Sequence, residues 1–598
     1  MCAIFGIHHP CIDGRKEDLE TMGNILFHRG PDGEGYYNSS EISMGMRRLS
    51  ILDIEGGNQP FFSQDGRVVV LCNGEIYNHK ELRRELEAKG IVFTTNSDIE
   101  ILPHLYHFYG PDFVKKLNGM FAISLWDDRK KRLFLYRDHI GIKPIYYYVG
   151  KDTLVYASEM KAIAALDRFE GELNISAASC FLDLGYIPNS ASIFNSVERL
   201  EPGTYIIYDG NQTTKVNYWS LELEEGIDSK DINDLLSEIE PMIKESINMQ
   251  CVCDVPLGSY LSGGVDSSLV TALSAIETKG VVQSFHLKWN NVEGKTDESQ
   301  FANTVAENYN IDHHTFDSKD INILELLPKL VWHLDEPNGD AAFVPTYLLS
   351  KRASKDIKVI LSGAGGDELY GGYSRYLPES RIKSFLKKIF FHKDVKNSYY
   401  DTMTGIYSRK WKRYFPWYNR DNVEKKSIDN LFKYALKIDR TNAKMLLDVR
   451  SYLVDNILFI TDKMSSAASL ECRVPLLDVR LVEHSMKIPS EQKIPNGQLK
   501  HLLKKIASKY VDPHIIYREK EGFGSPVWDW IDQYKISHFD KLIFSGYLVS
   551  EMGLVHLKDF NKAKMKKSDY WMYWRILVLE IWYRIYVKKI ECDQIFDL

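Results

Sequence analysis

The sequence predicts a two-domain protein of mixed α+β and α/β class, and three observations support that prediction. The chain has 598 residues, enough for at least two domains with cores of their own. Residues 221–234 are polar, acidic and without hydrophobic periodicity, which is typical of a boundary between domains. After that segment, short apolar runs alternate with helix-like segments, as in a doubly wound parallel sheet. We therefore expect one domain over residues 2–220 and a second over residues 234–598.

Composition excludes several classes of protein. Hydrophobic residues make up 44% of the chain and charged residues 26%, so disorder is not expected. A net charge of −7 gives no electrostatic footprint for nucleic acid or for an anionic membrane. The start lacks the basic segment and sustained apolar run of a signal peptide. Residues 571–587 are interrupted by Arg575, Glu580 and Arg584, which indicates a buried or amphipathic helix rather than a membrane span. With eight cysteines and no export signal, we expect a cytoplasmic protein with reduced thiols.

A Gly-rich loop, LSGGVDSS at residues 261–268, lies between a predicted strand at 258–261 and a predicted helix at 268–276. Glycines and the free N–H groups of a helix start let the backbone approach an anion. The loop matches neither GxxxxGK[ST] nor GxGxxG. Asp266 inside the turn would repel a phosphate unless a metal ion lay between them, so the loop predicts a pyrophosphate bridged by Mg²⁺. The alternative is a turn that only caps the following helix.

A second Gly-rich turn carries another aspartate. Strands are expected at 283–289, 312–316 and 357–361, alternating with helices at 298–309 and 323–334. The last of these strands runs into SGAGGDE at residues 362–368. Two such turns at strand ends fit one Mg²⁺ shared by Asp266 and Asp367. The alternative for Asp367 is a turn-forming residue at a helix start.

The N-terminus begins Met-Cys, and removal of Met1 would leave Cys2 with a free α-amino group. That amine titrates near ~7.7–8.0 and the thiol near ~8.5, so the amine can take the thiol proton. This is the nucleophile–base pair of N-terminal nucleophile hydrolases. A cysteine at this position is common by chance, so the evidence has to come from the residues that follow.

The following residues supply a strand at 3–7 and a strand at 68–72 that we expect to end in Asn73-Gly74. This dipeptide indicates a turn, and it can also present a side-chain amide and a backbone N–H together, as an oxyanion hole requires. Asn78 is expected to cap a helix at 80–89 that stops at Gly90. A further helix is expected over 99–109.

Several short motifs occur in order in this part of the chain: MCAIFGI, HRGPD, RRLSILD, NGEIYN, SD at 97–98, NGMFAISLWD, RDHIGIKPIYYY and YASEMKAI. Together they resemble the glutaminase domain of class II glutamine amidotransferases. The resemblance implies an αββα Ntn-hydrolase sandwich, Cys2 as nucleophile, and an oxyanion hole formed by Asn73 and Gly74. It also implies that Arg48 meets the glutamine α-carboxylate and that Glu75 and Asp98 meet the ammonium, as their charges suit. The implied glutamine site comprises Arg48, Leu49, Ser50, Ile51, Leu52, Asn73, Gly74, Glu75 and Asp98. The alternative for Arg48 and Glu75 is a solvated surface pair.

The loop SGGVDSS resembles the pyrophosphate loop of the ATP-pyrophosphatase superfamily. With LDEP, LSGAGGDELYGGY, DKMSSAASLECRVPLLD and NGQLKHLLKK, the second half resembles the synthetase domain of glutamine-dependent asparagine synthetases. The resemblance implies an adenine nucleotide alpha-hydrolase-like sheet with helical additions, and Lys500 stabilising charge at the reacting phosphate or the tetrahedral adduct. The alternative for Lys500 is a solvated, lysine-rich helix face. The implied ATP site comprises Leu261, Ser262, Gly263, Gly264, Asp266, Ser267, Ser268, Leu287, Ser362 and Gly363, with Asp266 and Asp367 holding Mg²⁺.

The two resemblances imply a two-site enzyme that takes ammonia from glutamine and passes it through an internal passage to an adenylated carboxylate. The substrates would be glutamine, Mg-ATP and an acceptor, in the first place aspartate; neither nucleic acid nor a membrane is an expected partner. The oligomeric state stays open, a homodimer included. One departure concerns the acceptor: Ala364 stands where the resembling enzymes usually have an acid linked to adenylate formation. Residues 381–440 are rich in lysine and aromatics and suggest only a helical cover.

Four other readings remain. The same scaffold could amidate another carboxylate, such as a sugar acid or a peptide. A tRNA-modifying ATP pyrophosphatase is disfavoured by the acidic balance and the intact glutaminase half. A non-catalytic glutamine or nucleotide sensor is disfavoured by Cys2, Asp266 and Asp367 and favoured by Ala364. The ring-closing lactam synthetases of this fold typically lack the terminal cysteine.

Overall fold

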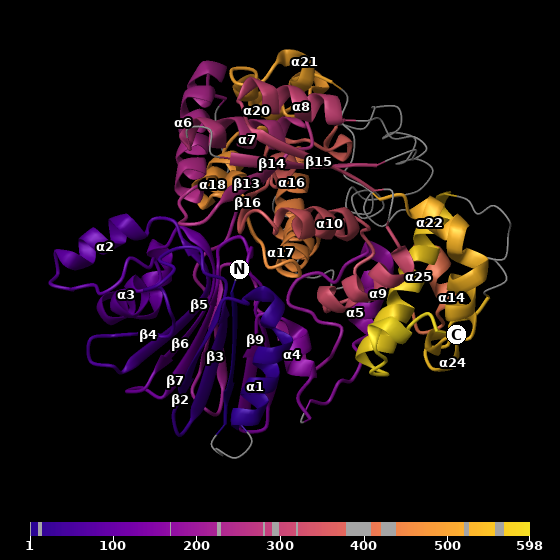
Figure 1. Ribbon diagram of the computed structural model, residues 1–598, viewed down its shortest axis with the longest axis horizontal. Helices are drawn as coiled ribbons and strands as arrows, with labels where there is room; N and C mark the ends of the chain where they lie inside the picture. The colour runs from indigo at the N-terminus through magenta and orange to yellow at the C-terminus, as the bar shows by residue number, and fades with distance from the viewer. Residues whose placement is uncertain are drawn as a thin grey trace.

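The computed structural model describes residues 2–9, 15–167, 169–223, 229–278, 282–289, 298–318, 321–377, 408–419, 438–518, 525–556 and 567–597. Figure 1 shows two sheets in the N-terminal part, a third sheet in the C-terminal part, and a helical unit that ends the chain. The predicted two-domain α/β architecture is confirmed. The N-terminus lies between the N-terminal sheets and the C-terminal sheet, close to α17 (Phe459–Ser466).

The N-terminal part is a sandwich of two six-stranded sheets. The first sheet has the order β10-β8-β9-β1-β3-β2, and the second has the order β12-β11-β7-β6-β5-β4. Their strands are β1 (Ala3–His8), β2 (Gly33–Asn38), β3 (Ile42–Arg48), β4 (Phe61–Phe62), β5 (Val68–Ile76), β6 (Gly119–Asp127), β7 (Arg132–Arg137), β8 (Tyr146–Gly150), β9 (Thr153–Ala157), β10 (Val197–Arg199), β11 (Thr204–Tyr208) and β12 (Thr213–Asn217).

Helices cover both outer faces of this sandwich, which confirms the αββα arrangement. Helices α1 (Arg15–Ile25), α4 (Met160–Ala164) and α5 (Ile175–Leu184) share an apolar cluster with the first sheet, and α2 (His79–Glu87) and α3 (Ile101–Tyr109) share one with the second. The continuous apolar run of β5 follows from this layering. Val68 and Val70 pack under α2 and α3, while Val69 and Leu71 pack between the sheets, because successive side chains point to opposite faces.

The C-terminal sheet is parallel, in the order β15-β14-β13-β16-β17. Its strands are β13 (Leu257–Tyr260), β14 (Val282–Lys288), β15 (Asp312–Asp317), β16 (Val359–Leu361) and β17 (Glu471–Arg473). One side of this sheet is covered by α6 (Ile232–Gln250), α7 (Val265–Glu277), α8 (Ser299–Asn308), α18 (Val479–Met486) and α20 (His501–Ala507) (Figure 1). The other side is covered by α10 (Phe343–Ala353) and α17. The predicted doubly wound sheet is therefore confirmed.

A helical unit packs beside the sheet and contains α9 (Ile323–Leu334), α14 (Ser408–Tyr414), α22 (Val527–Tyr534), α23 (Asp540–Phe544), α24 (Tyr547–Ser550) and α25 (Lys567–Tyr586). Helix α25 is largely buried among the others, as expected for its apolar sequence. Among the described residues, no helix is both long enough and apolar enough to cross a membrane.

Three local predictions were wrong. Asn73 and Gly74 do not form a turn, since β5 continues through them to Ile76, paired with β6 throughout. Asn78 precedes α2 but does not cap it, because its Oδ1 accepts from the Asn118 backbone nitrogen (2.9 Å). The helix after the phosphate loop begins at Val265 rather than at residue 268. Most of residues 381–440 lie outside the described residues, so the interpretation as a helical cover stays a prediction.

Candidate active sites

Cys2 lies at the start of β1, and three residues contact it. Its backbone nitrogen donates to Asn73 Oδ1 (3.1 Å), and its thiol lies 3.9 Å from the Leu49 carbonyl oxygen. Its carbonyl oxygen accepts from Arg29 Nε at 3.1 Å. Burial raises the pKa of the Cys2 thiol. The thiol therefore needs a base close by before it can act as a nucleophile at neutral pH.

Asn73 and Gly74 lie on β5, directly beside Cys2. Asn73 Oδ1 accepts from the Cys2 nitrogen, while the Asn73 Nδ2 amide is buried and has no hydrogen-bond partner among the described residues. A buried donor left unpaired costs about 1–3 kcal/mol, so its presence beside a nucleophile indicates a place for a ligand oxygen. Gly74 has φ of +152° and its Cα packs against the Met120 carbonyl, where any side chain would clash.

Arg48 is buried at the end of β3 and organises the segment that follows it. Its Nη1 donates to the Ile54 carbonyl and to Asn58 Oδ1, both at 2.9 Å, and its Nη2 donates to the Asp53 carbonyl at 2.7 Å. The predicted contact between Arg48 and a glutamine carboxylate stays a prediction. Within the segment it shapes, Leu49, Ser50 and Ile51 are buried and Leu52 is half-buried.

Glu75 and Asp98 are two buried carboxylates in the same site. Burial raises the pKa of Asp98 to about 6, although the Ile76 backbone N–H donates to it at 2.7 Å. Burial also raises the pKa of Glu75 well above its usual range, opposed by the positive charge of Arg473. The alternative of a solvated surface pair is wrong, since Arg48 and Glu75 are both buried. A buried pair of acids suits a cationic group of a ligand.

Residues of the C-terminal part complete this site, and sequence reasoning gave them no role. Arg473 Nη2 lies 3.3 Å from Glu75 Oε1. Lys358 Nζ lies 2.7 Å from Asp32, whose carboxylate also accepts from the Ser50 nitrogen (2.8 Å). The motifs HRGPD and ECRVPLLD contained Asp32 and Arg473, but a motif alone does not show that they meet across a domain boundary.

Asp254 makes a further contact of this kind, through both its backbone and its side chain. Its nitrogen donates to the Ile51 carbonyl (2.9 Å), and its carboxylate accepts from the Asp53 nitrogen at 2.7 Å. The loop after β3 is therefore fixed from the C-terminal part as well as by Arg48.

The two Gly-rich loops lie against each other at the carboxyl ends of β13 and β16. In the first, Ser262 Oγ lies 3.0 Å from Ser267 Oγ and accepts from the Gly264 nitrogen (3.3 Å). Gly263 has φ of +72°, a conformation that favours glycine. A Cβ at Gly363 would lie 2.8 Å from the Asp266 backbone, so the second loop touches the start of α7 directly. Ser268 differs from the rest, since it is buried on the core side of α7.

Lys500 lies between the two aspartates of these loops. Its ammonium contacts Asp266 and lies 2.7 Å from Asp367 Oδ1, and the side chain is 6% exposed, so the alternative of a solvated helix face is wrong. Burial lowers its pKa, but the two carboxylates outweigh burial and raise the pKa. Both aspartates therefore converge on one cationic position, and hard carboxylate oxygens beside a phosphate loop fit Mg²⁺. The described residues contain no cluster of three or more His, Cys, Asp or Glu that could hold a metal on its own.

The remaining predicted ATP residues lie on neighbouring strands. Leu261 follows β13 and is buried, and its nitrogen donates to the Phe285 carbonyl of β14 (3.0 Å). Leu287 is half-buried at the end of β14. Ala364 is half-buried in the second loop and its nitrogen donates to Ser362 Oγ (3.3 Å). No acid stands at position 364 to meet an acceptor.

Comparison with known proteins decides the family. A family model described as asparagine synthase matches residues 238–584, and one described as a glutamine amidotransferase domain matches residues 1–219. The chain belongs to the asparagine synthase family. It is 31% identical to glutamine-hydrolyzing asparagine synthetase 1 of Bacillus subtilis (strain 168), over 98% of this chain and 97% of that protein.

Other members of the family match nearly as much of the chain. A putative glutamine-hydrolyzing asparagine synthetase of Mycobacterium tuberculosis (strain H37Rv) is 29% identical over 97% of this chain and 95% of that protein. Asparagine synthetase B of Escherichia coli (strain K12) is 28% identical over 90% of this chain and 84% of that protein. The chain is accordingly a ligase of the asparagine synthase family that uses glutamine as amide donor, which confirms the class of enzyme predicted from sequence.

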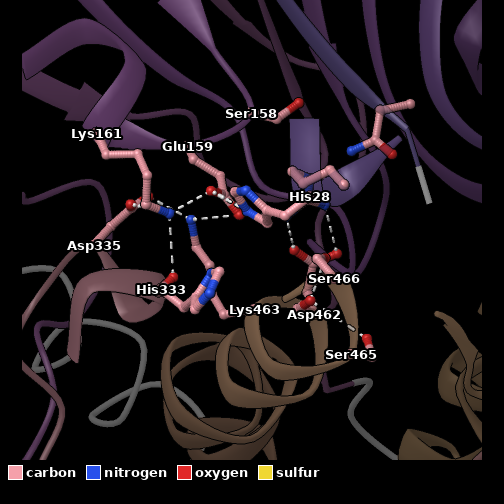
Figure 2. Close-up of polar contacts among 12 residues, drawn as sticks. His28, Ser158, Glu159, Lys161, His333, Asp335, Asp462, Lys463, Ser465 and Ser466 are labelled. Atoms are coloured by element: carbon pink, nitrogen blue, oxygen red, sulfur yellow. Dashed lines mark hydrogen bonds and ion pairs between the residues drawn. The ribbon is translucent and has the colours of Figure 1, made fainter. Parts of the chain in front are cut away.

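In this family member, a buried network of charges joins the two domains (Figure 2). Arg29 Nη1 lies 2.8 Å from Glu159 and 2.9 Å from Asp462, which comes from α17 of the second domain. On the other side of Glu159, Lys161 and Lys463 both reach Asp335, at 2.7 and 2.5 Å. Each of these side chains is at most 4% exposed. Truncating one partner of such a buried pair leaves an uncompensated charge, so the domains are held in one arrangement.

The two domains of this asparagine synthase family member also share an apolar cluster. Leu49, Met120 and Ile142 of the glutaminase half pack in the same cluster as Val474 and Leu476, which follow β17. Met120 lies on β6, opposite Glu75 of β5. Apolar side chains therefore connect the surroundings of Cys2 to the synthetase sheet. The internal passage for ammonia stays a prediction.

Proposed function

We propose that this chain converts a carboxylic acid into its amide, with ammonia from glutamine and activation by Mg-ATP. One observation carries the proposal: the amide Nδ2 of Asn73 is buried beside the Cys2 nucleophile and has no partner in the described part of the chain. It lies on a strand whose Glu75 is contacted by the synthetase domain. This arrangement suits a tetrahedral oxyanion on glutamine next to a site for its ammonium group.

In the first half-reaction, removal of Met1 frees the Cys2 amine, which takes the thiol proton. The Cys2 sulfur attacks the side-chain amide carbon of glutamine, and Asn73 Nδ2 with the Gly74 N–H holds the oxyanion. The carbon–nitrogen bond then breaks, ammonia leaves with the proton, and water hydrolyses the thioester to glutamate. Asn73 Oδ1, 3.1 Å from the Cys2 nitrogen, orients the amine.

In the second half-reaction, an acceptor carboxylate oxygen attacks the α-phosphorus of ATP and pyrophosphate leaves. Ammonia attacks the resulting acyl adenylate, loses a proton and displaces AMP. The backbone of residues 262–264 and the hydroxyl of Ser267 cradle the phosphates, and Lys500 neutralises charge as it develops. Mg²⁺ held by Asp266 and Asp367 would supply charge neutralisation for the pyrophosphate leaving group.

We propose aspartate as the acceptor, giving asparagine, because relatives named asparagine synthetases match almost the whole chain. Ala364 favours a second candidate, in which the same site amidates a different carboxylate. Alanine cannot pair with the ammonium group of aspartate, and an acid without that group would not need such a partner. A cytoplasmic location and a homodimer stay predictions.

The test compares Cys2→Ala with the wild type, measuring acceptor-dependent pyrophosphate release with glutamine or with ammonium as nitrogen source. Cys2→Ala should lose the glutamine-dependent reaction and keep the ammonia-dependent one. Cys592→Ala, which replaces a half-buried cysteine near the C-terminus, is the matched control and should keep both. Loss of both reactions in Cys2→Ala alone would contradict the division into two sites.

The acceptor is tested by running the same assay with aspartate and with a panel of sugar acids, peptides and other amino acids. Pyrophosphate release with aspartate, together with asparagine in the product, supports the first candidate. Release with another acid and none with aspartate supports the second. Binding of glutamine and ATP with no pyrophosphate release from any acid would favour the sensor.

A further inference from the structure

Arg473 is a fully buried cation at the end of β17 that contacts both halves of the enzyme. Its Nε donates to Glu471 at 2.8 Å, and its Nη1 donates to the Gln250 and Val252 carbonyls, both at 2.8 Å. Its Nη2 lies 3.3 Å from Glu75, which belongs to the other domain. The guanidinium is therefore held by several acceptors of its own domain while one nitrogen reaches the proposed glutamine ammonium site.

The backbone of the same residue contacts the phosphate loop. The Arg473 carbonyl accepts from the Ser362 nitrogen at 2.9 Å, and Ser362-Gly363 is the proposed phosphate contact after β16. Gly363 in turn lies against the Asp266 backbone. One residue thus connects Glu75 through its side chain to the phosphate loop through its backbone.

A second connection runs parallel to the first, along β16. Lys358 precedes this strand and pairs with Asp32 (2.7 Å), which accepts from the Ser50 nitrogen. Three residues later the strand ends at Leu361 and the phosphate loop begins. At ~3.3 Å per residue, the strand spans about 10 Å. Two adjacent short strands, β16 and β17, therefore join the glutamine loop to the phosphate loop through paired backbone and charged contacts.

We propose that Arg473 is a positioning residue that couples glutamine binding to nucleotide binding, an inference that rests on the proposed function. Glutamine bound at Glu75 favours one position of Arg473, and the nucleotide bound at Ser362 favours the same position. The second ligand then binds to a protein already in that position, so the two ligands strengthen each other's binding. The coupling must be reciprocal, and known couplings are about 5- to 150-fold.

The experiment uses full-length protein with Cys2→Ala, which binds glutamine without turning it over. The dissociation constant of an ATP analogue with a methylene bridge between its α- and β-phosphorus atoms is measured by calorimetry in Mg²⁺, with and without saturating glutamine. The reverse titration of glutamine is run with and without the analogue. We expect each ligand to tighten the other by the same factor, at least about fivefold.

Arg473→Lys in the same background keeps the charge but cannot reach all four acceptors, because lysine lacks the guanidinium fork. We expect both ligands still to bind and the coupling factor to fall close to one. Arg480→Lys is the matched control: Arg480 pairs with Asp478 and Glu245 and is 37% exposed, and the control should keep the full factor. Where Arg473→Lys does not fold, Glu471→Gln weakens the hold on the same guanidinium from its own domain and should also lower the coupling.

Three results would overturn the proposal: no coupling in Cys2→Ala alone, an unchanged factor in both Arg473→Lys and Glu471→Gln, or an equal fall in Arg480→Lys. Failure of the proposed function looks different, since the wild type would then release no pyrophosphate with any acceptor, whatever coupling the binding experiments show.

Discussion

The ammonium of Lys500 lies 2.7 Å from Asp367 and also contacts Asp266, the two aspartates that sequence reasoning assigned to a metal ion. A single lysine therefore compensates two carboxylates that would otherwise repel each other at the junction of the two phosphate loops. Under the proposed function, the same ammonium would lie beside the pyrophosphate leaving group as that group gathers charge.

Lys500→Met should reduce pyrophosphate release at least about 100-fold with either nitrogen source, because it removes a charge that stabilises the transition state. Glutamine hydrolysis at Cys2 should be retained, since Lys500 belongs to the other domain. Lys504→Met, one turn further along α20 with its ammonium near the Tyr517 ring, is the control and should stay close to wild type. Parallel loss in both lysine variants would indicate a general effect of removing charge from α20.

Asn73→Ala should lower kcat for glutamine hydrolysis about 100- to 1000-fold, the usual effect of deleting one oxyanion donor. Ammonia-dependent pyrophosphate release should remain, because Asn73 lies on β5 of the glutaminase domain. Asn24→Ala, which removes an exposed amide bonded to Arg47, serves as control. A purely structural role for Asn73 would instead lower both activities together.

The kcat/KM for glutamine should fall as pH drops through about 6, because burial raises the pKa of Asp98 to about 6 and only the ionised acid attracts an ammonium group. The direction of this effect follows from the raised pKa of Asp98, because the carboxylate is negatively charged above this pKa and neutral below it. The steady-state rate is measured from pH 5 to 8. The rate of ammonia-dependent synthesis, calculated from the concentration of unprotonated ammonia, should not fall in this pH range. A fall in that rate as well would assign the titrating group to the synthetase site.

Arg29→Met should lower the free energy of unfolding by about 3–5 kcal/mol, since it leaves Glu159 and Asp462 buried and only partly compensated. Denaturant unfolding followed by tryptophan fluorescence measures the change. Lys16→Met breaks an ion pair whose partners are 87% and 58% exposed, and should cost less than about 1 kcal/mol. Equal effects in the two variants would show that the buried charge network does not hold the domains together.

Much of the architecture could be predicted because local patterns and tertiary packing agree. The alternation of apolar runs and helical segments after residue 257 corresponds to real strands and helices, with ends displaced by at most three residues. The predicted turn at Asn73-Gly74 was wrong because pairing with β6 outweighs the turn preference of the dipeptide. Asn78 was predicted to cap α2, but its amide bonds to Asn118, a partner 40 residues away.

The site was predictable residue by residue but not in its connections. Sequence patterns selected Glu75, Asp98 and Lys500 as separate charges. That Arg473 reaches Glu75 depends on how two domains meet, and nothing in a 398-residue separation along the chain indicates it. The contact of Lys500 with both Asp266 and Asp367 could not be predicted either. It forms only because three distant segments converge at the carboxyl ends of parallel strands.

Arg29 pairs with both Glu159 and Asp462, so this buried network can form only after both domains have been synthesised. A ribosome finishes the N-terminal half, residues 2–220, about 240 residues before Asp462 is made, so until then Arg29 lacks one of its two carboxylate partners. The buried charges of the N-terminal half therefore reach their final balance only once α17 has been translated.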